Sequence, residues 1–144
     1  MSPERHQDQR RSNEFEVGID AESSGRFETG LNDAARAELF AQAEHDYCSS
    51  FPDASRRFAG TWCAKEAAVK ALSRWVRLDP RRVVVTWASD GRPSIGISGW
   101  NADKAGVSTS VSISSHGSLA VAWVVAWGPP PDSDGNAPRQ GRPS

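Results

Sequence analysis

The segment FAGTWCAKEAAVKAL, residues 58–72, constrains the fold more than any other stretch, because it has helical spacing and almost no polar face. At about 100° per residue, its large apolar side chains form one stripe, which consists of Phe58, Trp62, Val69, Leu72 and, further on, Val76. Small residues suited to close backbone packing occupy the opposite face, namely Gly60, Ala64, Ala67 and Ala71. A helix that is apolar on most sides is buried on most sides. We therefore expect this helix at the centre of the domain.

Three charged residues interrupt the apolar helix. Lys65 lies inside the stripe, Glu66 lies at its edge, and Lys70 follows four residues after Glu66. Glu66 and Lys70 have the spacing of an exposed ion pair worth about 0.2–0.5 kcal/mol, and the long stem of Lys65 is able to pass Trp62 and reach water. The alternative is that these charges face a ligand.

The patterns on either side predict an α+β fold, in which a mostly antiparallel sheet packs against the central helix. In EFEVGID the apolar residues alternate to one face, and SDGRP is a strong turn signal between two strand-like segments. The predicted elements in chain order are a strand at 14–20, a helix at 32–48 with Asn32 or Asp33 as N-cap, the central helix from 58 to 76, and strands at 81–88, 94–100, 108–115 and 119–127.

Length and composition predict a single domain. The chain has 144 residues, of which 38% are hydrophobic and 24% charged, enough for an ordinary core. We place the domain at residues 14–128, between a tail at 1–13 and a Pro/Gly-rich tail at 129–144 whose compositions are typical of disorder. No apolar run approaches the roughly 20 residues of a membrane span, and no signal peptide is recognisable. Cys48 and Cys63 have neither zinc-site nor disulfide spacing, so we expect a cytoplasmic protein.

The charges are unevenly distributed along the chain. Residues 20–53 hold eight acids and two bases, a net charge of −6, whereas residues 56–82 hold eight bases and two acids, a net charge of +6. The two blocks are either solvated faces that attract each other or a basic surface for an anionic ligand or acidic partner. A net charge of −1 without a continuous basic face argues against nucleic-acid binding.

A second acidic feature ends the first strand. Asp20 and Glu22 are two residues apart, so both are able to point into one site where the chain turns. Together with Glu66 they would form a cage of carboxylate oxygens, the ligand type that magnesium prefers, and Lys65 and Lys70 would bind an anionic substrate beside it. The alternative for Asp20 is a turn or helix-capping residue.

Taken together, these motifs resemble the 4′-phosphopantetheinyl transferase superfamily, and in particular its short members, the holo-acyl-carrier-protein synthases. The resemblance rests on five segments in the family's order, which are VGIDAESSGRF (17–27), FAQAEHDYC (40–48), RFAGTWCAKEAAVKAL (57–72), DGRPSIGISG (90–99) and STSVSISSHGSLAVAWVV (108–125). The pairing of GID with a downstream W-x-x-KEA-x-x-K is the specific part. Glu22 stands where the larger, surfactin-synthetase-type enzymes carry a third metal ligand.

The resemblance implies a magnesium-dependent transferase of fatty acid or polyketide biosynthesis. Such enzymes move 4′-phosphopantetheine from coenzyme A to a serine of an acyl or peptidyl carrier protein. Asp20, Glu22 and Glu66 would hold Mg²⁺, Glu66 or a metal-bound water would deprotonate the serine, and Lys70 would offset charge on the phosphate. Asp20, Glu66 and Lys70 are thus the expected catalytic residues.

The resemblance also implies where coenzyme A binds and how copies associate. The expected coenzyme A contacts are Lys65, Lys70, Arg74, Ser115 and His116. Short members of the family typically form homotrimers with the sites between subunits, so a homotrimer is expected.

Five features depart from the family pattern. Thr61 stands where short members usually carry an arginine, and SRWVRLDP replaces a glycine-rich turn. The histidine of the last strand pair falls on Ser115 rather than His116, and a second histidine at the head of that strand falls on Ser110. The helix after Arg26 is acidic, whereas short members tend to present basic residues there to an acidic carrier protein. A one-residue slip in a strand turns a side chain to the other face, so His116 needs a bulge to reach the ligand. These departures leave two alternative hypotheses, which are a carrier-binding or assembly module without transferase activity and a different reaction in the same pocket.

Overall fold

The computed structural model describes residues 12–28 and 33–131. The elements in chain order are β1 (Glu14–Ser23), α1 (Gly25–Glu28), α2 (Asp33–Leu39), α3 (Gln42–Ser49), α4 (Ala54–Leu72), the 3₁₀ turn η1 (Pro80–Arg82), β2 (Val83–Trp87), β3 (Pro93–Ile97), α5 (Ala102–Ala105), β4 (Ser108–His116) and β5 (Leu119–Gly128). The predicted α+β class and the position of the central helix are confirmed.

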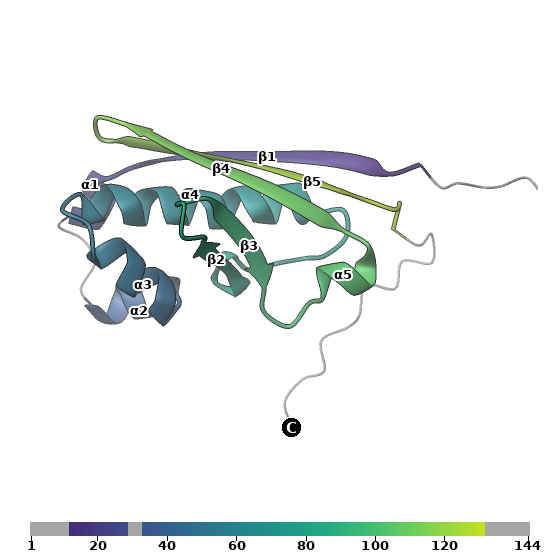
Figure 1. The fold of residues 1–144 in the computed structure, drawn as a ribbon, viewed down its shortest axis with the longest axis horizontal. Coiled ribbons are helices and arrows are strands. Elements are labelled where there is room, and N and C mark those ends of the chain that lie inside the picture. Colours follow the sequence, from purple (N-terminus) through teal and green to yellow (C-terminus); the bar gives the residue numbers. More distant parts are fainter. Residues whose placement is uncertain (1–11, 29–32, 132–144) are drawn as a thin grey trace, which may run out of the picture.

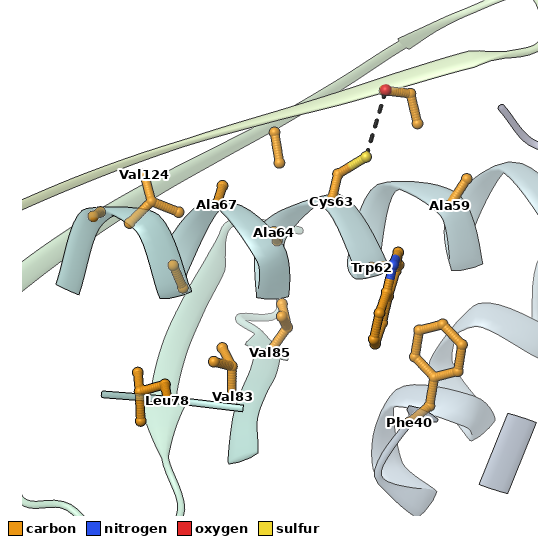
Figure 2. Packing of buried hydrophobic residues seen from close by; sticks show 14 of the residues in the cluster. Phe40, Ala59, Trp62, Cys63, Ala64, Ala67, Leu78, Val83, Val85 and Val124 are labelled. Carbon is orange, nitrogen blue, oxygen red and sulfur yellow. Dashed lines mark hydrogen bonds between the residues drawn. The ribbon is translucent and has the colours of Figure 1, made fainter. Parts of the chain in front are cut away.

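Helix α4 lies between two layers. A three-stranded antiparallel sheet, in the order β1-β5-β4, covers one side, and α2, α3 and the two-stranded hairpin β2–β3 cover the other (Figure 1). Figure 2 shows Cys63 and Ala67 on the sheet side of α4, and Trp62 on the other side, toward Phe40. The helix is buried on both sides, as its almost wholly apolar sequence requires.

Small residues allow the sheet to lie directly on the helix backbone. A Cβ atom added to Gly18 of β1 would lie 2.9 Å from both the carbonyl carbon of Ala67 and the nitrogen of Ala71. A Cβ atom on Gly60 would lie 2.8 Å from the Cγ2 atom of Ile113 in β4. The first half of α4 therefore contacts β4, and its second half contacts β1.

The hairpins follow the prediction closely. β2 and β3 pair antiparallel from Val83 with Ile97 to Trp87 with Pro93, around the turn that contains Gly91. β4 and β5 are joined at Gly117, whose φ of 57° is a left-handed conformation suited to glycine.

Two helix predictions are wrong at their boundaries. The predicted helix at 32–48 is two helices, because the chain becomes extended at Ala41, with φ −64° and ψ 153°. The break places the ring of Phe40 against Phe27 and Phe58, at centroid distances of 5.9 and 5.0 Å. The proposed N-cap Asn32 lies outside the described residues, as do the side chain of Asp33 and most of both tails.

The central helix ends at Leu72 and does not reach Val76. The chain turns here, where the Trp75 backbone N–H donates to the Leu72 carbonyl at 2.9 Å. The indole Nε1 of Trp75 donates to the Pro129 carbonyl at 2.7 Å, which ties this turn to the end of β5.

The outward face of the three-stranded sheet is apolar. Phe15, Val17 and Ile19 share a face as predicted, but that face points away from α4, with exposed fractions of 66%, 50% and 47%. Trp123 and Leu119 of β5 continue it, at 52% and 50%. We call these five residues the outer apolar face. Within the described residues, no helix is long and apolar enough to cross a membrane.

Candidate functional site

Alternation along β1 places acidic side chains on the side of the sheet that faces α4. Asp20 and Glu22 share this side with Gly18, whereas Ile19 points outward. Glu66 of α4 faces the two acids. Burial raises the pKa of Glu66 above its ordinary value, and the negative charges of Asp20 and Glu22 raise it further. We call Asp20, Glu22 and Glu66 the acid cluster.

The buried thiol of Cys63 adjoins this cluster. Burial, followed by the charges of Asp20 and Glu22, raises the pKa of Cys63 to about 12, so the thiol stays protonated. Its Sγ atom lies 3.5 Å from the Ala120 carbonyl oxygen of β5, to which it donates (Figure 2).

Two basic side chains contact the acid cluster. Lys70 Nζ donates to Asp20 Oδ1 at 3.2 Å and to the Ile19 carbonyl at 2.8 Å. Arg26 Nη1 donates to Glu22 Oε2 at 2.9 Å. Lys70 thus turns to β1 and forms its ion pair with Asp20 rather than the predicted exposed pair with Glu66.

The donor set of the acid cluster has the oxygen chemistry that magnesium prefers. The arrangement does not form a closed metal site, because no group of three or more His, Cys, Asp or Glu side chains within the described residues is placed to hold a metal ion. Two of the three carboxylates are instead directed at Lys70 and Arg26.

The structure places Lys65 away from the acid cluster. Its side chain is fully buried, so it does not extend to water past Trp62. Lys65 Nζ donates to both carboxylate oxygens of Glu44 in α3, at 2.6 and 2.9 Å. Burial lowers the pKa of Lys65, and Glu44 opposes that shift. The motif FAQAEHDYC contains Glu44, but no pattern in the sequence indicates that this acid is the partner of Lys65.

The remaining predicted contacts are divided between the two edges of the sheet. Arg74 forms ion pairs with Glu14, at 2.8 Å, and with Glu16, both on β1.

Ser115 of β4 lines a cavity, whereas His116 pairs with Leu119 on the opposite face and is exposed. No bulge returns His116 to the inner face, because the register of β4 and β5 is continuous.

The cavity beside β4 has a volume of about 340 Å³. Its lining residues come from α4 and β4, including Arg56, Arg57, Thr61 and Ser115, and from α3 and the β2–β3 hairpin. In the α3 and hairpin part of the lining, the rings of Tyr47 and Trp87 stack at 3.8 Å and 9°.

Sequence reasoning missed Arg56 and Arg57 as site residues, although both belong to the basic block at 56–82. Arg57 contacts Asp53 at 3.4 Å and lies 4.1 Å from the ring centre of Phe51. Arg56 has no acidic partner in the part of the chain that the structure describes, so its charge remains available to an anion in the cavity.

The acid cluster and the cavity lie on opposite flanks of the sheet. β1 carries the cluster and β4 lines the cavity, and β5 separates the two strands. Adjacent strands are about 4.8 Å apart, so β1 and β4 are separated by roughly 10 Å with α4 beneath them. A phosphate-bearing ligand in the cavity therefore does not automatically touch the acid cluster of the same chain.

Comparisons with known proteins identify the family of this chain. A family model described as the 4′-phosphopantetheinyl transferase superfamily matches residues 16–124. The holo-acyl-carrier-protein synthase of Anaeromyxobacter dehalogenans (strain 2CP-C) is 35% identical over 130 residues, which cover 80% of this chain and 97% of that protein.

Solved structures show the same fold. The Mycobacterium tuberculosis acyl carrier protein synthase has 32% identity and a TM-score of 0.61, covering 79% of this chain and 97% of that one. The Helicobacter pylori holo-acyl-carrier-protein synthase, solved in complex with coenzyme A, has 26% identity and a TM-score of 0.63, covering 75% and 96%. The chain therefore belongs to the 4′-phosphopantetheinyl transferase superfamily, with the holo-acyl-carrier-protein synthase type as its relatives, as its motifs predicted.

Proposed function

We propose that this protein transfers 4′-phosphopantetheine from coenzyme A to a serine of an acyl or peptidyl carrier protein. The observation that carries the proposal is the acid cluster, in which Glu66 of the KEA motif meets Asp20 and Glu22 of the GID strand within a chain of this family. Crowded carboxylates are unfavourable for folding, and their presence together at one place fits a catalytic role.

Asp20, Glu22 and Glu66 are the residues that would hold Mg²⁺. The ion would supply positive charge beside the pyrophosphate of coenzyme A, and it would relieve the repulsion that raises the pKa of Glu66. In the structure Lys70 and Arg26 already supply positive charge to the cluster, since Lys70 pairs with Asp20 and Arg26 pairs with Glu22.

Glu66 and Lys70 have different roles in the reaction. Glu66 accepts the proton of the carrier serine. The serine oxygen then bonds to the β-phosphorus of coenzyme A, the bond between that phosphorus and the bridging oxygen breaks, and 3′,5′-ADP leaves. Lys70, half-exposed and next to Asp20, stabilises the charge on the phosphoryl oxygens.

The cavity beside β4 is the proposed site for the nucleotide end of coenzyme A. Arg56 and Arg57 offer guanidinium groups for phosphate, and the stacked Tyr47 and Trp87 offer an aromatic wall for the base. Arg74 is a weaker candidate for phosphate, because it already pairs with two glutamates.

We further propose that the protein acts as a homo-oligomer, most simply a trimer, in the cytoplasm. The outer apolar face is an exposed surface of large side chains, which in other proteins marks an association site. Head-to-tail association through this face brings the β4 flank of one copy beside the β1 flank of the next, which would join cavity and acid cluster into one site. Cys48 and Cys63 are free thiols, in keeping with a reducing compartment.

The intact mass of a carrier protein tests the proposal. Apo carrier proteins encoded near this gene are incubated with the protein, coenzyme A and Mg²⁺, and a phosphopantetheine-sized mass gain on the carrier serine is expected. Glu66→Gln should abolish the gain, whereas Glu38→Gln, a neutralised exposed acid of α2, should keep it. The absence of any gain together with the absence of coenzyme A binding by calorimetry would refute transferase activity. Carrier binding without coenzyme A binding would favour a carrier-binding module.

A further inference from the structure

The ion pair of Lys65 with Glu44 is buried completely. Both side chains have no exposed surface, and Lys65 Nζ also lies 5.8 Å from the ring centre of Phe40. Removing two charges from water is costly, and apolar side chains of similar volume often fill such a space at lower cost. The pair therefore has to supply something that apolar side chains do not.

The carboxylate of Glu44 supplies hydrogen-bond acceptors to the backbone. Its Oε1 atom accepts from the Ala41 N–H at 2.7 Å, and its Oε2 atom accepts from the Val85 N–H at 3.0 Å. Val85 lies in the middle of β2 and is buried. A leucine in place of Glu44 would leave that buried N–H without this acceptor. One carboxylate thus connects α3, α4 and β2.

The connection matters because the β2–β3 hairpin is a separate sheet. It is not hydrogen-bonded to β1, β5 or β4, so side-chain contacts fix its position against the helices. Tyr47 follows Glu44 by three residues and Trp87 follows Val85 by two, and these two aromatic rings stack. The Glu44 hydrogen bond and the aromatic stack therefore hold the same contact between α3 and β2.

That contact is also a wall of the cavity beside β4. Tyr47 of α3 lines it together with Trp87 and Pro93 of the hairpin, and Arg56 and Thr61 of α4 line the same cavity. A shift of the hairpin changes the width of the cavity without touching the acid cluster on the other flank.

We propose that Glu44, held by Lys65, is a positioning residue for the coenzyme A cavity. It fixes the β2–β3 hairpin against α3 so that Tyr47 and Trp87 stand at the distance from Arg56 that the ligand requires. The inference rests on the proposed function in one respect, which is the identity of the ligand. Lys65 serves to hold the Glu44 carboxylate in place through two hydrogen bonds, and it does not contact the ligand.

Two charge-neutral double variants separate positioning from ion-pair stability. Glu44→Leu with Lys65→Met removes both backbone acceptors, whereas Glu44→Gln with Lys65→Met keeps one acceptor oxygen. The first variant should raise the KM for coenzyme A about tenfold while kcat changes less than about twofold, because the cavity wall moves and the acid cluster does not. The second variant should fall between the first and the wild type.

Amide hydrogen exchange gives a readout that does not depend on activity. The Val85 amide should exchange faster in the Leu/Met variant than in the Gln/Met variant, when the two are compared at the same interval below their melting temperatures. Trp87→Leu, which keeps the ion pair, should raise the KM for coenzyme A while Val85 stays protected. This third variant tests whether the aromatic wall binds the ligand, and the Gln/Met variant decides the role of Glu44 if the Leu/Met variant does not fold.

An unchanged KM for coenzyme A in both the Gln/Met variant and Trp87→Leu would overturn the proposal, as would a Leu/Met variant that lowers kcat alone. If the wild-type protein binds no coenzyme A, the proposed function fails independently. The exchange rate of Val85 then still decides the positioning role, since unchanged protection in the Leu/Met variant would show that Glu44 does not hold the hairpin.

Discussion

Replacing Gly18 with alanine tests the close approach of β1 to α4. The added Cβ atom would lie 2.9 Å from the carbonyl carbon of Ala67 and from the nitrogen of Ala71, and closer still to the carbonyl oxygen of Ala67. Carbon and other heavy atoms normally stay about 3.5–4.0 Å apart, so the two contacts at 2.9 Å alone require an outward shift of roughly 0.6 Å, and the closer carbonyl oxygen requires a larger one. All three obstructing atoms are backbone, so no side-chain rotation relieves the clash.

Overpacking of this kind costs about 3 kcal/mol, the upper end of the usual range, because two regular elements have to separate. For a domain of this size, that corresponds to a fall in melting temperature of about 10–20 °C. Gly96→Ala is the matched control, since a Cβ atom on Gly96 in the exposed hairpin has nothing within 4 Å.

Thermal unfolding followed by circular dichroism measures both variants. Transfer activity, measured where each variant is folded, should also fall in Gly18→Ala, because Asp20 lies two residues further along the displaced strand. A Gly18→Ala variant that melts within about 2 °C of the Gly96→Ala control would show that β1 does not rest on the helix backbone.

Three further predictions follow from the site and its surroundings. Glu66→Gln should melt at a higher temperature than the wild type at pH 7 in the presence of a chelator, because the pKa of Glu66 is raised in the folded state and its charged form destabilises the fold. The difference in melting temperature should vanish below about pH 4, where the carboxyl is protonated. A lower melting temperature of Glu66→Gln at pH 7 would contradict this. Trp123→Glu on the outer apolar face should convert the oligomer to a monomer in size-exclusion chromatography with light scattering, and an unchanged molar mass would refute association through that face. Native protein should resist iodoacetamide at about pH 8, because burial raises the pKa of Cys48 to about 11 and that of Cys63 to about 12, whereas rapid labelling would show that these thiols are accessible.

The acid cluster shows what periodicity is able to predict. Strand alternation places Asp20 and Glu22 on one side, and the amphipathic analysis of the central helix places Glu66 at the edge of its buried stripe. Both inferences depend only on local geometry. Whether these acids bind magnesium remains a prediction.

Lys65 shows what periodicity is unable to predict. The helical wheel correctly buries it, but its partner Glu44 is 21 residues away on a different helix. The partner is chosen by the packing of α3 on α4, and the break at Ala41 that orients α3 depends on the burial of Phe40 among distant rings. Local sequence carries little information about such contacts.

For a related reason, the sequence does not predict which face of the sheet packs on α4. Alternation shows that Phe15, Val17 and Ile19 share a face, but β5 is apolar on both faces, so the pattern does not say which one meets the helix. Gly18 decides it, because only a residue without a side chain fits against Ala67. The outward position of His116, in contrast, followed correctly from its one-residue displacement.

Mixing two inactive variants tests whether a transferase site is shared between copies. We propose that the acid cluster of one copy and the cavity of another form one site. Glu66→Gln inactivates the cluster, and Arg56→Gln with Arg57→Gln weakens the cavity, so neither variant alone should modify a carrier protein. After the two are mixed and allowed to exchange subunits, carrier modification should reappear, because some sites then combine an intact cluster with an intact cavity. If mixed oligomers, verified by native mass spectrometry, remain inactive, the site is not shared between copies.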